Sequence, residues 1–341
     1  MPTKDMLLEV NNLKTYFRTE RGLLQAVDDV SFNLCRGETL GIVGESGCGK
    51  SISCMSLCRI VESPPGTYEG GEIIFDGRTL LRINENEKFM ISEKEMRSIR
   101  GNEISYIFQE PMTSLNPVFK IGRQLSEPLM VHQGMNKKQA LEESIRTLEL
   151  VRIPNAERVV NEYPFSLSGG MRQRAMIAMA LVCQPKLLIA DEPTTALDVT
   201  IQAQVLALIN DLKTDTNASV IFITHDLSVI AEMSDRVIVM YAGKIVESAP
   251  VELLFGQAKH PYTQGLIASR PDSIEQEGSS GEAAKRLTVI PGNVPDMTHR
   301  PEGCPFYPRC EKGMDICVQT FPPAQEFSQG HSACCWLYDK K

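Results

Sequence analysis

The sequence predicts an α/β fold, and three features of the chain support this prediction. Short apolar runs at residues 39–43, 104–108, 187–190 and 219–224 have the length and composition of buried strands. Segments with helix-like composition lie between these runs. A glycine-rich loop joins the first run to one of those segments. Strands that alternate with helices in this way are typical of a sheet whose faces are covered by helices.

The glycine-rich loop reads GESGCGKS and matches the pattern G-x-x-x-x-G-K-S at residues 44–51. It lies between the strand-like run and the helix-compatible residues 52–60, as a phosphate-binding loop requires. Glycines let the backbone wrap around phosphates, while N–H groups and a helix N-terminus present partial positive charge. Lys50 can add a full charge at the β- and γ-phosphates, and the Ser51 hydroxyl can bind Mg²⁺. The candidate residues for a nucleoside triphosphate are Gly44, Glu45, Ser46, Gly47, Cys48, Gly49, Lys50 and Ser51.

Composition limits the class of protein. The chain has 341 residues, of which 42% are hydrophobic, so it can form two domains with cores. It carries 35 basic and 43 acidic residues, and its formal net charge of -8 argues weakly against a nucleic-acid partner. The first residues are too polar for a signal peptide, and no apolar run approaches the roughly 20 residues of a membrane span. We therefore expect a cytoplasmic protein that can dock on a membrane protein.

The N-terminal part reads as antiparallel strands. Residues 6–34 alternate apolar and polar positions on either side of a turn at 20–22. Phe17 lies where its ring could stack on adenine, although the spacing alone favours ordinary packing in the sheet. Residues 70–77 predict a strand that enters a turn, and the charged residues 84–100 predict a helix.

The middle of the chain combines helices with a second small-residue motif. Helical periodicity over residues 121–160, broken by Gly134 and Pro154, predicts a helical insertion in the sheet domain. The sequence LSGGMRQR at 167–174 then opens an apolar helix. Small residues with a serine at a helix start make an anion-binding terminus. The candidates for this contact are Ser168, Gly169 and Gly170.

Polar side chains follow three of the strand-like runs. Gln109 follows the second run, Asp191 and Glu192 follow the third, and His225 follows the fourth. Asp191 would help to hold Mg²⁺, and Glu192 could position or polarise an attacking water. An acidic strand-to-turn junction is the plainer reading, but the phosphate-binding loop in the same chain argues against it. Since ligands collect at the carboxyl ends of parallel strands, we expect His225 near the γ-phosphate, although a lone histidine is more often structural.

The chain changes in character from about residue 256, where prolines and cysteines become frequent after a polar stretch at 271–286 that we expect to be flexible. The possible sulfur ligands here are Cys304, Cys310, Cys317 and either Cys334 or Cys335. In a reducing compartment such a group indicates a metal or iron–sulfur site before it indicates disulfides. The spacing is not the C-x-x-C of a zinc ribbon, so iron–sulfur ligands, free or structural thiols and zinc ligands all stay open. A metal centre would stabilise a small appended domain with little core of its own.

Together these motifs resemble the ATPase subunit of ATP-binding cassette (ABC) transporters. The resemblance rests on GESGCGKS, Gln109, LSGGMRQR, LLIADE, ALD and His225, in this order and spacing over residues 6–250. The signature LSGG-x-x-Q between the loop and the acidic strand is the most specific of them. The segments YIFQEPMTSLNP, HPYTQGLI and GCPFYPRC…GHSACC are similar to the ATPases of dipeptide/oligopeptide importers, and among these to the D-type subunits of dipeptide permeases. Nickel importers of the same subfamily share many of these features.

The resemblance implies both architecture and activity. It implies a P-loop NTPase cassette over residues 1–255, with a RecA-like core, an antiparallel β subdomain and a helical subdomain at about 110–180. A peptide-importer-type C-terminal domain with the cysteine cluster would follow over 256–341. The chain would hydrolyse ATP to ADP and phosphate to drive import of dipeptides or oligopeptides. The alternatives are a nickel or other metal importer and a soluble ABC ATPase acting on DNA or ribosomes; the single cassette and the acidic balance argue against the latter.

The resemblance also assigns roles to single residues. Phe17 would stack on adenine, Gln109 would contact Mg²⁺ and the attacking water, and Asp191 would hold Mg²⁺. Glu192 would be the catalytic carboxylate, and His225 would contact the γ-phosphate. Three signature residues, Ser168, Gly169 and Gly170, would bind the γ-phosphate of ATP held by the opposite subunit. Asp198 would line the dimer interface. Cys48 replaces a residue that is commonly serine and creates a possible oxidation site.

Cofactors and partners are implied in the same way. The cofactors would be ATP, Mg²⁺ and a 4Fe–4S cluster whose ligands are Cys304, Cys310, Cys317 and Cys335. The family's His-x-x-x-Cys pattern aligns His331 with Cys335 and so favours Cys335 over Cys334. The partners would be a paralogous ATPase subunit, two transmembrane permease subunits and an extracytoplasmic peptide-binding protein, with no nucleic acid. The chain would then lie at the cytoplasmic face of the inner membrane.

Overall fold

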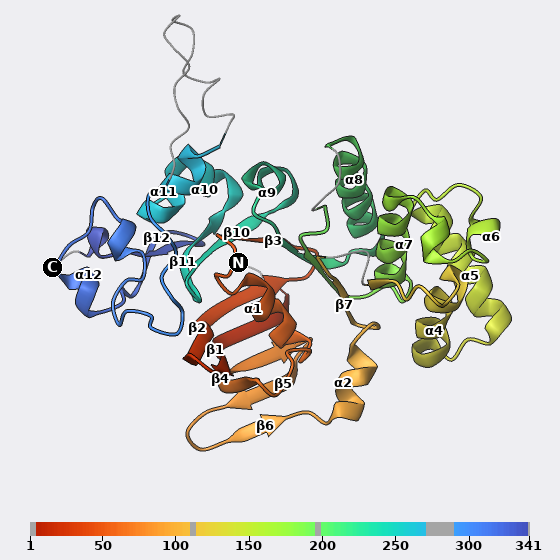
Figure 1. Cartoon of the computed structure of the whole chain (residues 1–341), viewed down its shortest axis with the longest axis horizontal. Coiled ribbons are helices and arrows are strands. Elements are labelled where there is room, and N and C mark those ends of the chain that lie inside the picture. The colour runs from red at the N-terminus through yellow and green to blue at the C-terminus, as the bar shows by residue number, and fades with distance from the viewer. Residues whose placement is uncertain (1–4, 110–113, 195–198, 271–289, 340–341) are drawn as a thin grey trace, which may run out of the picture. The chain divides into compact units, whose positions relative to one another are not determined.

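The computed structural model describes residues 5–109, 114–194, 199–270 and 290–339. These residues divide into two compact units, drawn in Figure 1. We call the described residues within Leu8–Asn33, Leu40–Phe89 and Thr224–Lys341 the loop unit, because they contain the glycine-rich loop. We call those within Met1–Leu7, Leu34–Thr39 and Met90–Ile223 the signature unit, because they contain LSGGMRQR.

An antiparallel sheet forms the first part of the loop unit. Its strands follow the order β2-β1-β4-β5-β6. Their bounds are β1 Met6–Thr19, β2 Gly22–Cys35, β4 Gly66–Phe75, β5 Arg78–Ile83 and β6 Lys88–Met90. Leu8 and Val10 of β1 are buried, as the alternating pattern predicts, and a register shift between Asn11 and Lys14 moves the next buried positions to Leu13 and Thr15. Helix α1 (Lys50–Leu57) lies against β1, since Thr15 Oγ1 and Ser56 Oγ are hydrogen-bonded at 2.9 Å.

A second set of strands in the loop unit carries the glycine-rich loop. Strand β3 (Thr39–Val43), which ends at the loop, is buried along its whole length and pairs in parallel with β10 (Arg236–Tyr241). A hairpin turn at residues 242–243 joins β10 to β11 (Lys244–Pro250), and the two strands pair in antiparallel fashion. Helices α9 (Leu227–Met233), α10 (Val251–Gln257) and α11 (Pro261–Ala268) belong to the same unit.

The cysteine-rich segment continues this set of strands. Strand β13 (His331–Cys334) pairs with β11, with Glu247 opposite Ala333, and β12 (Ala324–Ser328) pairs with β13. The short helices are η3 Tyr307–Arg309, α12 Ile316–Gln319 and η4 Trp336–Tyr338. The segment therefore shares backbone hydrogen bonds with the strands that position the glycine-rich loop.

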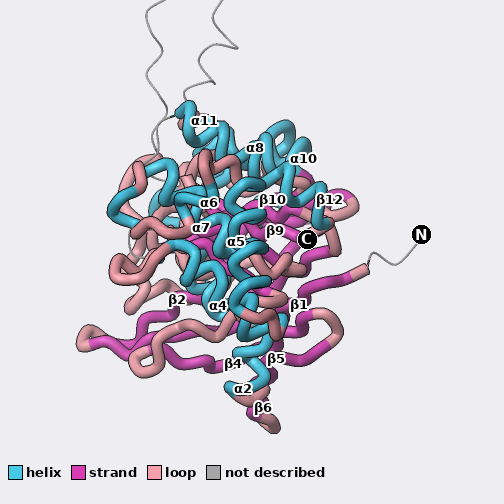
Figure 2. Tube along the Cα trace, turned by 90° about the vertical axis from the view of Figure 1, so that its right-hand side faces the viewer, coloured by secondary structure: helices cyan, strands magenta, loops and turns pink. Residues whose placement is uncertain are grey.

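The signature unit combines parallel strands with helices. Strands β7 (Ile104–Ile107), β8 (Leu187–Asp191) and β9 (Ser219–Ile223) pair in parallel, with β8 in the middle. Helices α4, α5, α6 and α7 lie next to one another, at the right of Figure 1 and facing the viewer in Figure 2. The helices are α2 Glu93–Ile99, α4 Ile121–Gln133, α5 Lys137–Leu150, α6 Ala156–Val159, η1 Pro164–Ser166, α7 Gly169–Leu181 and α8 Val199–Thr216.

One helix prediction was wrong over half of its length. Within residues 84–100 only α2 is helical, and Lys88–Met90 form the short strand β6. The helix starts late because Ser92 forms a capping box with Glu95, which fixes its first turn. The breaks predicted at Gly134 and Pro154 are confirmed, since α4 ends at a left-handed Gly134 and α5 ends before Pro154. No helix in the described part of the chain is long and apolar enough to cross a membrane.

Candidate functional site

The glycine-rich loop needs its glycines for steric reasons. Gly44, Gly47 and Gly49 have φ angles of 152°, 78° and 100°, which side chains rarely tolerate. A Cβ atom at Gly44 would collide with the carbonyl oxygen of Met240, and one at Gly49 with that of Ala26. The loop is therefore held closely against its neighbours, and its sequence leaves little freedom at these positions.

Lys50 is the first residue of α1, and its side chain reaches back into the glycine-rich loop. Its ammonium group donates to the carbonyl oxygens of Gly44, at 2.8 Å, and Glu45, at 3.0 Å, and the residue is 6% exposed. Ser51 lies in the first turn of α1, next to this charge. The loop, the ammonium group and the helix N-terminus together can bind a polyphosphate.

Cys48 is an exception to the expectations drawn from the sequence. Its side chain is fully buried, and burial raises the pKa of its thiol even though Lys50 lies nearby. Because the thiolate is the reactive form, burial and the raised pKa of Cys48 argue against the suggested oxidation site.

Two predicted site residues, Gln109 and Glu192, meet directly in the signature unit. Gln109 Nε2 donates to Glu192 Oε2 at 3.2 Å. Glu192 has a φ angle of 47°, and its N–H donates to the carbonyl oxygen of Ile223 at 2.9 Å. Such a backbone conformation is uncommon outside glycine and costs free energy that the surrounding strands must supply. The two side chains are thus held together just beyond the ends of β7 and β8.

Asp191 has a partner that sequence reasoning missed. The residue is 5% exposed, and the Tyr106 hydroxyl donates to Asp191 Oδ2 at 2.7 Å. Tyr106 lies on β7, which pairs with β8, so the hydrogen bond depends on strand pairing rather than on distance along the chain. The sequence could have suggested this hydrogen bond only through a prediction that β7 and β8 are neighbours in the sheet.

The signature residues lie at the start of α7. The hydroxyl of Ser168 accepts a hydrogen bond from the N–H of Met171 and caps the helix, while Gly169 is exposed. An added Cβ at Gly169 would meet no atom within 4 Å. Further along α7, Gln173 Nε2 donates to the carbonyl oxygen of Pro193, which connects the helix to the turn after Glu192. Asp198 lies outside the described residues.

Comparison with known proteins places this geometry in a family. Residues 27–195 match the family described as ABC transporter, and residues 246–317 match the oligopeptide/dipeptide transporter C-terminal region. A probable peptide ABC transporter ATP-binding protein of Sinorhizobium fredii is 50% identical over 98% of this chain and 96% of its own length. The oligopeptide transport ATP-binding protein OppD of Bacillus subtilis is 50% identical over 97% of this chain and 88% of its own.

The chain belongs to the ABC transporter family. A solved structure, described as the dimeric post-hydrolysis state of an ATP-binding cassette bound to ADP and Pi, superposes with a TM-score of 0.61. It is 24% identical and covers 72% of this chain and 99% of its own. The predicted ABC cassette fold, with an antiparallel β part and a helical part, is thereby confirmed.

In this ABC cassette, two further predicted residues lie in the loop unit. His225 is exposed and lies just before α9, whose first turn is capped by the carboxylate of Asp226. Phe17 is half-buried near the end of β1, where its backbone pairs with Gly66. A Cβ at Gly66 would come within 3.1 Å of the Phe17 ring, so Gly66 leaves space for that ring. The roles of His225 and Phe17 stay predictions.

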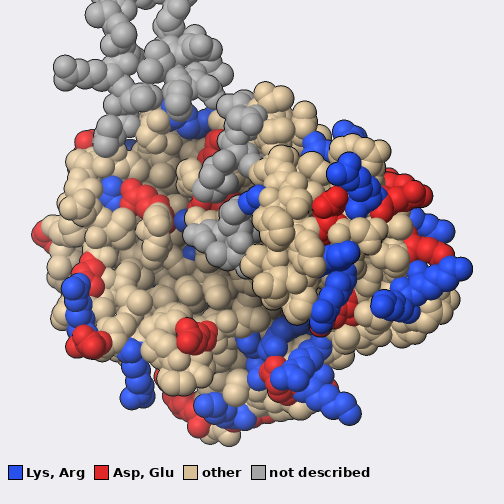
Figure 3. Space-filling view, turned by 45° about the vertical axis from the view of Figure 1, so that its right-hand side comes forward, with Lys and Arg blue, Asp and Glu red and all other residues tan. Residues whose placement is uncertain are grey.

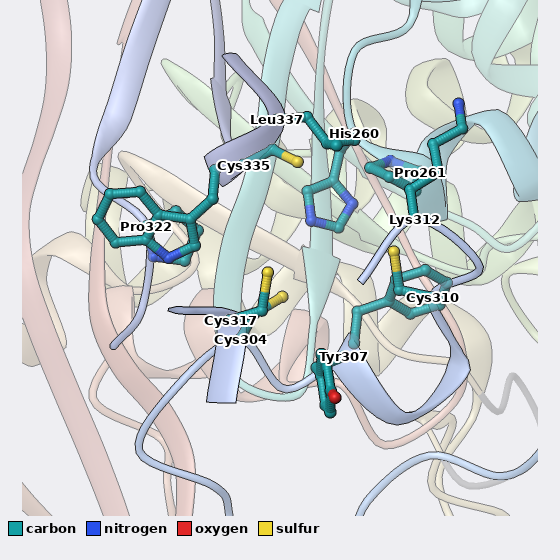
Figure 4. Close-up of a pocket in the computed structure, with 12 residues that line it drawn as sticks. His260, Pro261, Cys304, Tyr307, Cys310, Lys312, Cys317, Pro322, Cys335 and Leu337 are labelled. Atoms are coloured by element: carbon teal, nitrogen blue, oxygen red, sulfur yellow. The ribbon is translucent and has the colours of Figure 1, made fainter. Parts of the chain in front are cut away.

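Four cysteines of the C-terminal segment line one pocket. They are Cys304, Cys310, Cys317 and Cys335, and Figure 4 shows them around the ring of His260. Cys334 is not part of the lining and lies on β13, so the pocket groups Cys335 with the other three. Among the described residues, no three or more His, Cys, Asp or Glu side chains form a group that could hold a single metal ion.

Burial dominates the chemistry of this pocket. It raises the pKa of Cys304 to about 12 and also raises the pKa values of Cys310 and Cys335, while the neighbouring cysteines add to each effect. Burial lowers the pKa of His260 to about 3, so this ring is neutral, and its Nδ1 accepts from the N–H of Tyr262 at 3.1 Å. The thiols of Cys304, Cys310 and Cys335 stay protonated unless a cation stabilises their thiolate forms.

Charges of both signs share the surface of the protein. On the face in Figure 3, Lys and Arg side chains lie among Asp and Glu side chains. Some of these charges form ion pairs between residues four positions apart, such as Lys138–Glu142 and Arg158–Glu162. The expectation that no nucleic acid binds stays a prediction.

Proposed function

We propose that this chain is the ATP-hydrolysing subunit of a peptide importer. The observation that carries the proposal is the combination of a glycine-rich loop that holds Lys50 with a C-terminal region like that of oligopeptide/dipeptide transporters. The relatives named as peptide and oligopeptide transport ATP-binding proteins support the same substrate class.

The site residues divide the chemistry among them. The loop and Lys50 bind the phosphates, and Ser51, Asp191 and Gln109 bind Mg²⁺, which ATP brings with it. Glu192 polarises the attacking water, and its hydrogen bond with Gln109 supports this pairing. His225 contacts the γ-phosphate, and Phe17 stacks on the adenine ring.

The signature residues act on a second chain. Ser168, Gly169 and Gly170 lie at an exposed helix N-terminus, which suits an anion brought by another subunit. Two ATPase subunits close around ATP and open after hydrolysis, and this cycle drives two permease subunits. We infer that the second ATPase is a paralogue and that Asp198 lines the interface with it.

The membrane partners follow from this cycle. The chain lies at the cytoplasmic face of the inner membrane, bound to the permeases, and an extracytoplasmic protein delivers the peptide. Three apolar side chains of the signature unit, Val118, Val131 and Phe165, are 67–69% exposed and are candidates for the permease contact.

The cysteine pocket is proposed to hold a 4Fe–4S cluster. Four cysteines around one space supply the thiolate ligands that such a cluster uses, and bound iron would stabilise the thiolate forms that burial disfavours. Four irons and four sulfides separate their thiolate ligands by more than a single ion does. Because ATP hydrolysis requires no electron transfer, the role of the cluster is structural or regulatory.

Uptake by cells tests the proposed function. Cells that carry the Glu192→Gln variant should lose uptake of a labelled dipeptide but keep uptake of nickel, whereas the exposed Glu85→Gln variant should keep both. If only nickel uptake falls, the family stands and the substrate class is wrong. If neither uptake changes, the chain energises a different process.

A further inference from the structure

The second residue of the phosphate-binding loop is held by two residues that lie far from it in the sequence. Arg309 makes a bidentate ion pair with Glu45, with Nη1 2.7 Å from Oε2 and Nη2 3.0 Å from Oε1. The hydroxyl of Tyr262 accepts a hydrogen bond from the N–H of Glu45 at 2.8 Å. Both the backbone and the side chain of Glu45 are therefore fixed from the C-terminal part of the loop unit.

Each of the two residues is itself held firmly. The Arg309 side chain is 6% exposed, and its guanidinium also donates to the carbonyl oxygen of Pro291, at 2.8 Å, and to the Tyr241 hydroxyl, at 3.2 Å. Tyr262 is fully buried, and its ring centroid lies 4.6 Å from that of Tyr241. A rigid, bidentate guanidinium fixes a carboxylate in direction as well as in charge.

The negative charge of Glu45 matters for nucleotide binding. A carboxylate in a loop that receives polyphosphate repels the ligand unless a cation neutralises it. Its side chain is 26% exposed, so solvent does not screen it fully.

We propose that Arg309 and Tyr262 are positioning residues of the ATP site, which hold Glu45 neutralised and the phosphate-binding loop in its binding shape. The proposal rests on the proposed function only in that the chain binds ATP. It makes the C-terminal segment part of the nucleotide site, since Arg309 is adjacent to Cys310 and Tyr262 follows His260 and Pro261 of the cysteine pocket.

Equilibrium binding of ATP and ADP to the purified full chain, with Mg²⁺ present, tests the proposal. Arg309→Met should raise the dissociation constant for ATP about tenfold and that for ADP less, because ATP carries one more negative charge. The double variant Glu45→Gln/Arg309→Met should return the ATP value to within about threefold of the original, because it removes both charges. Tyr262→Phe should weaken ATP and ADP equally, because it removes a contact to the backbone.

A matched control separates positioning from stability. Arg100 makes a similar bidentate pair with Glu93 on α2, so Arg100→Met should change neither dissociation constant. If Arg309→Met does not fold, as judged by its thermal melt, the variants Glu45→Gln and Arg309→Lys still test the proposed role of Arg309. Glu45→Gln should bind ATP at least as tightly as the original chain, and Arg309→Lys should give an intermediate value.

Three results would overturn the proposal. They are unchanged ATP affinity in a folded Arg309→Met variant, an equal loss of affinity for ATP and ADP in that same variant, and no recovery of ATP affinity in the double variant. If the original chain fails to bind ATP at all, it is the proposed function that fails, and this outcome is distinct from the other three.

Discussion

At the scale of single residues, Asp28 shows how charge is accommodated in the loop unit. The Tyr16 hydroxyl donates to its carboxylate at 2.6 Å, Lys244 lies 2.8 Å from it, and Arg300 of the C-terminal segment also donates to it. Burial alone would raise the pKa of Asp28, but the hydrogen bonds from Lys244, Tyr16 and Arg300 outweigh burial and hold the pKa well below its usual value. One carboxylate thus joins β1, β2, β11 and the C-terminal segment.

Replacing Asp28 with Asn should lower the free energy of unfolding at pH 7 by about 3 kcal/mol, because two cations lose their partner. The folded-state pKa lies below the unfolded value, so the stabilisation is complete above about pH 4 and declines as the pH falls further. Denaturant titrations should therefore show that the free energies of unfolding of the original chain and of Asp28→Asn approach each other as the pH falls below about 4. The exposed neighbour Asp29→Asn is the control, and equal stability of Asp28→Asn and the original chain at pH 7 would contradict the argument.

At the scale of elements, buried strands were the most predictable part of the fold. Strands β3, β8 and β9 are buried at every position, and a short, mostly apolar run leaves few alternatives to a strand. The charged stretch 84–100 misled the prediction, because charge alone does not separate a helix from an exposed edge strand such as β6. The capping box at Ser92 was the signal that marked the true start of α2.

The start of α7 gives a prediction with a close control. An added methyl group meets no atom within 4 Å at Gly169 or at Gly256 of α10, so both alanine variants should fold normally. Gly169→Ala should lower the ATPase rate of the assembled transporter at least about tenfold, because the methyl group would stand between the helix N-terminus and a phosphate of the partner subunit. ATP binding to the single chain should not change. Equal ATPase rates for the two variants would argue against a role for Gly169 at the partner's nucleotide.

At the scale of the whole molecule, the sequence predicted which groups exist better than it predicted which of them meet. The motifs identified Gln109 and Glu192, and these residues are in contact. The contacts of Tyr106 with Asp191 and of Arg309 with Glu45 join positions 85 and 264 residues apart, and neither has a signature along the chain. Such pairs follow from strand order and from the path of the C-terminal segment, which residue patterns do not encode locally.

Purification without oxygen tests the proposed cluster. We expect a brown protein with about four iron atoms and four labile sulfides per chain. Cys335→Ser should lose iron, whereas Cys334→Ser should keep it, because of these two cysteines only Cys335 lines the pocket. A colourless protein with stoichiometric zinc would contradict the cluster, and equal iron loss in both variants would contradict the choice of Cys335.

The pairing of β13 with β11 also bears on how the chain is made. During synthesis, β11, which ends at Pro250, leaves the ribosome about 80 residues before His331 of β13. At about 5–20 residues per second this interval lasts roughly 4 to 16 s, during which one edge of β11 has no strand to pair with. An unpaired strand edge can pair with a strand of another chain. The nascent protein is therefore prone to aggregate through β11 until β13 emerges and pairs with it.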